Sequence, residues 1–160
     1  MPGTAPLDLA RAHALGKVLH VRRERPTGLI VGADTVVDLD GAAFGKPRDR
    51  AEAKVMLRAL SGRTHRVHSA FVLADGDDLI ERDSSTDVRF YPLSEAEIEA
   101  YVSTGDPMDK AGAYGIQTRG AALVEHIDGD FYTVMGFPLG LFVRTLAERG
   151  IELGSAPGAA

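Results

Sequence analysis

The stretch VGADTVVDLDGAAFGKPRD, residues 31–49, predicts the centre of the fold. Its apolar first half extends a run that begins two residues earlier, and together they predict a buried strand over 29–39. Asp40 and Gly41 are typical of a tight hairpin turn, after which the chain returns through 42–44. A strand, a turn and a short returning strand therefore form the element around which the rest of the chain is placed.

The same stretch carries an isolated acid and an isolated lysine. Asp34 ends the most apolar part of the strand, and Lys46 stands between a glycine and a proline after the hairpin. If both face one cleft, they suit metal-assisted chemistry on a phosphate. The carboxylate can hold a divalent ion or orient a water, and the ammonium can neutralise phosphate charge. The alternatives are an Asp that caps a turn and a solvated Lys.

The remaining pattern predicts helices alternating with hairpins. Asp49 with Glu52, and Ser94 with Glu97, read as capping boxes at two helix starts. The expected helices cover 7–21, 49–60, 94–102 and 139–149, and the expected hairpins pair 64–74 with 79–91 and 121–127 with 131–134. This order indicates one α/β domain over 7–150 with a mixed sheet whose long hairpins are antiparallel. Residues 1–6 are expected to be disordered and 151–160 to form a flexible tail.

The long loop 105–120 holds a second group of candidate site residues. Lys110 adds a cation, small residues permit close approach, and the Gln117 amide can pair with the edge of a base. Thr35 is a candidate contact to a base or sugar, and a plain strand former is the alternative. Arg63 is a candidate phosphate contact, with surface pairing to an acid as the alternative. A structural loop with a buried glutamine remains an open interpretation of the segment.

Composition limits the classes of function. The chain has 160 residues, no cysteine and a net charge of −5. These values exclude thiolate chemistry and argue against binding to nucleic-acid polymers, but not against a nucleotide substrate. No apolar run approaches a membrane span and no signal pattern begins the chain, so a cytoplasmic protein is expected. No histidine has zinc-ligand spacing, and His65 and His68 should point to opposite faces of one strand.

Several segments together closely resemble the Maf family of nucleoside triphosphate pyrophosphatases. They are GADTVV (32–37), GKPRD (45–49), LSGRTH (60–65), PLSEAEIEAYVSTGDPMDKAGAYGIQ (92–117) and GFPL (136–139). The resemblance implies a Maf/ITPase-like α/β fold with a mixed sheet flanked by helices. It also implies hydrolysis of nucleoside triphosphates to monophosphate and pyrophosphate with Mg²⁺ or Mn²⁺, and it is compatible with a homodimer.

The resemblance assigns roles to individual residues. Asp34 matches the catalytic acid, which also places the metal, and Lys46 matches a phosphate-binding lysine. Thr35 and Gln117 match positions tied to substrate choice. The wording DKAGAYGIQ, residues 109–117, resembles the branch that hydrolyses dTTP and UTP. Modified pyrimidine nucleotides are expected substrates of that branch as well.

One departure from the family pattern concerns the start of the chain. Family members begin with a strand and a Ser-x-Ser-Pro-Arg-Arg loop, which this sequence does not contain. The first alignable segment is 9–14, where His13 stands in place of the lysine of Leu-Ala-x-x-Lys-Ala. The first hypothesis is a pyrophosphatase that lacks the phosphate loop. The alternatives are a nucleotide-binding or septum-formation-inhibiting protein with impaired catalysis, and a structural dimerisation module.

Overall fold

Five strands form a single antiparallel sheet in the computed structural model, which describes residues 4–151. The sheet order is β2-β1-β3-β4-β5. The strands are β1 (Ile30–Leu39), β2 (Ala42–Phe44), β3 (Thr64–Asp75), β4 (Asp78–Phe90) and β5 (Val124–Asp128). The helices are α1 (Pro6–Glu24), α2 (Arg50–Leu60), α3 (Glu95–Ser103), α4 (Phe131–Met135) and α5 (Leu139–Glu148).

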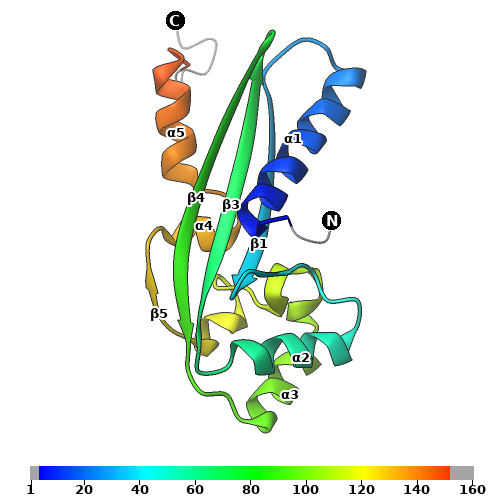
Figure 1. Ribbon diagram of the computed structural model, residues 1–160, viewed down its shortest axis with the longest axis vertical. Helices are drawn as coiled ribbons and strands as arrows, with labels where there is room; N and C mark the ends of the chain where they lie inside the picture. Colours follow the sequence, from blue (N-terminus) through cyan, green and yellow to red (C-terminus); the bar gives the residue numbers. More distant parts are fainter. Residues whose placement is uncertain (1–3, 152–160) are drawn as a thin grey trace, which may run out of the picture.

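The α/β class expected from the sequence is confirmed, but every strand pairing between residues 4 and 151 is antiparallel where a mixed sheet was expected. A parallel pair needs a connection that crosses a face of the sheet. Here α2 lies at the lower end of the sheet (Figure 1), so the chain re-enters through β3 from the end it left. Strand β3 therefore runs antiparallel to β1.

Helices α1 and α5 cover opposite faces of the long strands. Figure 1 shows α1 beside β1 and β3, and α5 on the other side of the β3–β4 hairpin. Ala10, Ala14 and Val18 are fully buried against small residues of the sheet. A Cβ on Gly32 would lie 2.8 Å from Val18 Cγ2 and 2.9 Å from the Ala14 carbonyl oxygen. The α1 backbone therefore lies unusually close to β1, which decides what its polar side chains can reach.

The larger core lies at the lower end, where α2, α3 and the 105–123 segment pack below the sheet (Figure 1). Its largest fully buried side chains include Phe90, Leu57, Leu60 and Ile98. Both predicted helix starts are confirmed. The Asp49 carboxylate accepts from the Glu52 amide, but the Glu52 carboxylate accepts from the Arg48 amide and not from that of Asp49, so the capping box predicted there is incomplete. Ser94 forms a complete capping box with Glu97. At the β1–β2 turn both residues, Asp40 and Gly41, have positive φ (54° and 84°), as a two-residue hairpin requires.

The hairpin predicted for 121–127 and 131–134 is wrong, because its second half is the helix α4. The Asp130 carboxylate accepts from the Thr133 amide at 2.7 Å and caps the start of the helix. Gly136, at φ 117°, ends it in the left-handed conformation. These two local signals outweigh the strand preference of the β-branched and aromatic residues between them.

The expected termini fall mostly outside the described residues. Pro6, placed in the N-terminal disordered segment, is the first residue of α1, whereas residues 1–3 and 152–160 lie outside the description. The 105–120 loop contains two short 3₁₀ turns, Asp106–Asp109 and Ala111–Ala113, and the start of a third, Arg119–Leu123. In the part of the chain that the structure describes, no helix has the length and apolar character needed to cross a bilayer.

Candidate functional site

Strand β1 separates the candidate site residues into two groups, because successive side chains of a strand point to opposite faces. The Asp34 side chain faces α1. The next side chain, Thr35, faces a cavity on the other side of the sheet, which Val37 also lines. The structure thus does not place Asp34 and Lys46 in one cleft, as the sequence suggested, since Lys46 lines the cavity on the Thr35 side.

On the α1 face, two side chains of α1 bind the Asp34 carboxylate. Lys17 Nζ donates to Oδ1 at 2.6 Å and to the Ala33 carbonyl oxygen at 2.7 Å. His13 Nδ1 lies 3.0 Å from Oδ2. His13 and Lys17 are four residues apart, so they occupy the same side of the helix. They are also next to Ala14 and Val18, whose close packing on β1 brings this side of α1 to the carboxylate.

The α1 face is open to solvent. The Asp34 side chain is only 18% exposed, whereas those of His13 and Lys17 are 53% and 55% exposed. These three residues line an open depression of about 470 Å³, together with Ala12, Gly16 and His20. A carboxylate fixed between a lysine and a histidine at a solvent-filled depression can orient a water molecule. The neighbouring Lys17 ammonium can bind an anion such as a phosphate.

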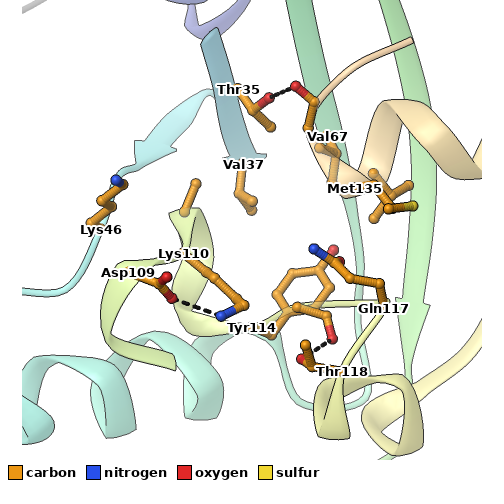
Figure 2. A pocket seen from close by; sticks show the side chains of 14 residues that line it. Thr35, Val37, Lys46, Val67, Asp109, Lys110, Tyr114, Gln117, Thr118 and Met135 are labelled. Atoms are coloured by element: carbon orange, nitrogen blue, oxygen red, sulfur yellow. Dashed lines mark hydrogen bonds and ion pairs between the residues drawn. The ribbon is translucent and has the colours of Figure 1, made fainter. Parts of the chain in front are cut away.

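The cavity on the other face has a volume of about 390 Å³ (Figure 2). Its lining comes from β1, the segment after β2, β3, the 109–118 loop and the end of α4. The residues are Thr35, Val37, Lys46, Val67, Asp109, Lys110, Ala111, Tyr114, Gly115, Gln117, Thr118, Val134, Met135 and Gly136. A cavity of this size, lined by both apolar and polar side chains, fits a small organic ligand.

Four of the predicted site residues line this cavity: Thr35, Lys46, Lys110 and Gln117. The Thr35 hydroxyl lies 2.7 Å from Ser69 Oγ and donates to the Gly136 carbonyl at 3.1 Å. The Gln117 side chain is exposed, and its amide makes no hydrogen bond to any residue between 4 and 151. Gln117 therefore presents both a donor and an acceptor to a ligand.

The two lysines of the cavity differ in how strongly they are held. Lys110 Nζ donates to Asp109 Oδ1 at 2.7 Å and to the Asp106 carbonyl oxygen at 2.8 Å. Burial lowers the pKa of Lys110, but the hydrogen bonds that Lys110 donates to Asp109 and Asp106 outweigh this effect, so the pKa stands above the ordinary value. Lys46 is exposed and forms no ion pair with a described residue. Figure 2 shows it at the edge of the cavity on the side away from Gln117.

Asp106 holds the 105–120 loop in the shape of a cavity wall. Its Oδ2 accepts from the Tyr101 hydroxyl at 2.8 Å and from the Thr118 hydroxyl at 2.5 Å. The Tyr101 oxygen in turn accepts from the Gly115 amide at 3.2 Å. Burial raises the pKa of Asp106, but hydrogen bonds from Thr118, Tyr101 and Lys110 outweigh it and lower the pKa overall. The carboxylate thus stays ionised and joins Lys110 and Thr118 of the loop to Tyr101 of α3.

Arg63 is not among the residues that line either hollow. Its guanidinium donates to the Asp40 carboxylate at the β1–β2 hairpin, and the Arg63 side chain is 47% exposed. This is the surface pairing that the sequence left open as an alternative. Arg63 therefore pairs with Asp40 of the hairpin and lines neither the cavity nor the depression.

The structure also tests whether a divalent metal fits. Within residues 4–151 no group of three or more His, Cys, Asp or Glu side chains could hold a metal ion. Asp34 is the one carboxylate that lines the α1-face depression. Mg²⁺ often binds through one or two carboxylates and takes its other ligands from water and substrate phosphates, so Asp34 could serve as its protein ligand if Lys17 or His13 releases a carboxylate oxygen.

Sequence reasoning missed three residues that the structure places at or behind these hollows: Lys17, Tyr114 and His65. The family lysine was taken to be replaced by His13, yet Lys17, one helical turn later, reaches the same carboxylate. The i, i+4 spacing was the available signal for Lys17. The contact between His65 and Tyr114 joins residues 49 positions apart and had no sequence signal.

Comparisons with known proteins agree with this geometry. The family model for Maf, described as Maf-like protein, matches residues 2–149. A dTTP/UTP pyrophosphatase from Symbiobacterium thermophilum is 49% identical over 149 residues, which are 93% of this chain and 77% of that protein. A dTTP/UTP pyrophosphatase from Bacillus velezensis is 50% identical over 148 residues, 92% of this chain and 78% of that protein.

Proposed function

The chain belongs to the Maf family, and from this premise we propose that it is a nucleoside triphosphate pyrophosphatase. The expected substrates are dTTP and UTP, the nucleotides in the names of its relatives. Modified pyrimidine nucleotides belong to the same expected class. The observation that carries the proposal is the juxtaposition on β1 of Asp34, bound by Lys17, with Thr35, which lines a ligand-sized cavity.

The edge of β1 connects the two faces. Strand β2 pairs with β1 only at residues Val37, Asp38 and Leu39, so in the described part of the chain the edge at Asp34 and Thr35 has no β2 partner. A nucleotide can therefore place its base in the cavity, near Gln117, while its phosphates pass along this edge. Lys46 lies beside that path, and Lys17 lies at its end next to Asp34.

In this arrangement Asp34 orients the attacking water and accepts its proton. The oxygen of the water bonds to phosphorus, and the α–β phosphoanhydride bond breaks. The bonding electrons of this phosphoanhydride bond stay on the oxygen of the leaving pyrophosphate, and the other product is the nucleoside monophosphate. Lys17 and Lys46 neutralise charge that builds on the phosphate oxygens, a role in which one donor typically accounts for about 10²–10³ in rate. Lys17 also holds the carboxylate in place through its bond to the Ala33 carbonyl.

A divalent ion, Mg²⁺ or Mn²⁺, fits the same position. Asp34 would hold it together with the phosphate oxygens and water. When bound, the ion supplies further neutralisation of the phosphate charge. Because Lys17 and His13 both occupy the carboxylate oxygens, one of these side chains has to give way to the ion.

A second candidate function, nucleotide binding without turnover, is favoured by the same contact. Both oxygens of Asp34 are already paired, one with Lys17 and one with His13. A carboxylate that stays so paired is not available to a water molecule or an ion. This candidate predicts that nucleotides bind in the cavity and are not hydrolysed.

The test is release of pyrophosphate from dTTP, UTP, dATP and dGTP with Mg²⁺ or Mn²⁺, using Asp34→Asn as the diagnostic variant. The matched control is Asp38→Asn, because Asp38 lies on the same strand and face and contacts His68 and the Gly41 amide instead. We expect Asp34→Asn to lower the rate by about 10³-fold or more. Asp38→Asn should retain it. If the Asp34→Asn variant still releases pyrophosphate at the wild-type rate, the proposed mechanism is wrong. If the wild-type chain binds nucleotides but releases no pyrophosphate, the second candidate function is correct.

A further inference from the structure

Three aromatic rings form a cluster behind the cavity. His65 on β3 is 3% exposed and meets Phe90 edge-on, with ring centroids 5.0 Å apart at 89°. Tyr114 meets both rings in the same way, at 5.4 Å from His65 and 4.7 Å from Phe90. Tyr114 also lines the cavity, where Figure 2 shows its ring between Lys110 and Gln117. A cavity wall is therefore connected directly to a buried histidine.

His65 and Tyr114 also share a hydrogen bond. His65 Nε2 lies 2.8 Å from the Tyr114 hydroxyl oxygen, whereas Nδ1 has no partner in the described part of the chain. Burial lowers the pKa of His65 to about 4, against a smaller opposing effect of Asp87. The imidazole is therefore neutral near pH 7 and carries a single proton.

The hydrogen bond to Tyr114 exists whichever nitrogen carries that proton. If Nε2 carries it, Nε2 donates to the Tyr114 oxygen, and the Nδ1 lone pair and the Tyr114 O–H have no other partner among residues 4–151. If Nδ1 carries it, Nε2 accepts from the Tyr114 hydroxyl, and the Nδ1 N–H has no partner in the same residues. In both cases breaking this bond would leave further buried polar groups unsatisfied, which costs free energy. The Tyr114 ring is therefore held from behind by His65.

We propose that His65 is a positioning residue for base selection, a role that rests on the proposed function. Through its hydrogen bond with the Tyr114 hydroxyl, His65 fixes the tyrosine ring as a rigid wall of set depth. A wall at fixed depth favours bases of one size over another, because a ligand too large has to displace a ring that is bonded from behind. Without His65, the Tyr114 ring keeps its packing against Phe90 but loses the contact that sets its tilt.

The test compares His65→Phe, Tyr114→Phe and the double variant in the full chain. The readouts are kcat and KM for dTTP and dATP and the thermal shift that each nucleotide induces. We expect each single variant to raise the KM for dTTP about five- to tenfold and leave kcat within about twofold. This corresponds to about 1 kcal/mol, the usual net value of one hydrogen bond. The preference for dTTP over dATP should fall by a similar factor, and the double variant should be no worse than the worse single variant.

Two further variants separate positioning from plain stability. His65→Gln retains an acceptor and should restore part of the dTTP preference. The matched control is His68→Gln, since His68 is buried on the same strand but faces α1 and contacts Ser85 and Asp38. It should lower the melting temperature without changing the preference. If His65→Phe does not fold, His65→Gln and Tyr114→Phe carry the test.

The outcomes distinguish this proposal from the function on which it rests. If the wild-type chain releases pyrophosphate and the variants keep its KM for dTTP and its preference for dTTP over dATP, the proposed role of His65 is wrong. The proposed function is then unaffected. A wild-type chain that binds nucleotides without hydrolysis overturns the function, and the thermal shifts of dTTP and dATP then decide on His65. If the loss of dTTP preference in the double variant equals the sum of the losses in the two single variants, the two side chains act independently. That result would also contradict the shared hydrogen bond.

Discussion

The two faces of β1 differ in nearly every physical respect. On the α1 face, Asp34 is paired with two cationic or titratable side chains that are more than half exposed. On the cavity face, Thr35 and Tyr114 are held by hydrogen bonds to Gly136 and His65, and Tyr114 is only 5% exposed. One strand therefore supports an open surface with a paired carboxylate and, one residue further on, a cavity wall of hydrogen-bonded side chains.

This difference indicates how one site can perform two tasks. Exposed charges are able to contact phosphate and water, but an ion pair in solvent specifies shape poorly. A buried and hydrogen-bonded wall specifies shape well, because its side chains have one arrangement. In the proposed function, the α1 face performs the chemistry and the cavity face selects the base. Variants on each face should consequently affect different kinetic constants.

The largest effect is expected from the α1 face, with Lys17→Met. Loss of its ammonium removes both the phosphate contact and the bond that orients Asp34, so kcat/KM should fall by about 10²–10³-fold. Steady-state pyrophosphate release measures this. Lys54→Met, which breaks the ion pair of another lysine with Glu99, is the control and should stay near the wild-type rate. If kcat/KM falls less than threefold in Lys17→Met, Lys17 is not part of the active site.

The next effect concerns the stability of the cavity face. The folded pKa of His65 is about 4, below its ordinary value of 6.5, so the unfolded chain binds more protons between these pH values. Stability from this residue is fully present above about pH 6.5 and is lost as the pH falls towards 4, by about 3 kcal/mol in all. Urea unfolding at pH 7 and pH 4.5 measures the loss. His65→Phe should show a flatter dependence in this interval, and parallel curves would contradict the assignment.

A smaller effect on selection is expected for Gln117→Leu. The variant removes a donor and an acceptor that form no hydrogen bond with a described residue, so stability should hardly change. The kcat/KM for dTTP should fall about tenfold or more, because the substrate loses hydrogen bonds that the site is built to make. A tenfold fall corresponds to about 1.4 kcal/mol. Arg119→Leu, an exposed change two residues later, is the matched control. An unchanged ratio of dTTP to dATP would exclude Gln117 from base selection.

The smallest effect is expected for Arg63→Ala. The ion pair with Asp40 is exposed on both sides, and such pairs contribute about 0–1 kcal/mol. We expect less than about a twofold change in KM for dTTP. A tenfold or greater rise would show that Arg63 leaves Asp40 and reaches the substrate, as the sequence predicted. Asp40→Asn separates the two cases, since it breaks the ion pair and leaves Arg63 in place.

Elements with a local cause were predicted well from the sequence. The capping box of Ser94 and Glu97 and the turn at Asp40 and Gly41 involve residues within four positions of one another, and both are confirmed. The helix α4 shows where this reasoning failed. Its aromatic and β-branched residues indicated a strand, but Asp130 and Gly136 cap a short helix instead. Strand preference depends on partners that a sequence does not name.

The candidate site was predicted in part. Thr35, Lys46, Lys110 and Gln117 do line one cavity, yet Asp34 lies on the other face of the strand. The alternation of side chains along β1 already implied that neighbouring residues face apart. Which of them would meet Lys17 depended on the packing of α1 at Gly32, a contact between segments far apart in the chain.

The sequence by itself determined the chemical inventory of the protein: one acid and one lysine beside turns, a loop that contains a glutamine amide, no thiols, and the family that these motifs resemble. Only the tertiary structure decided that Lys17 and His13 share the Asp34 carboxylate, that Arg63 pairs with the hairpin, and that His65 holds Tyr114. The physical reason is distance along the chain. Caps and turns join neighbours and are encoded locally, whereas these contacts exist only after two separate segments have packed against the sheet.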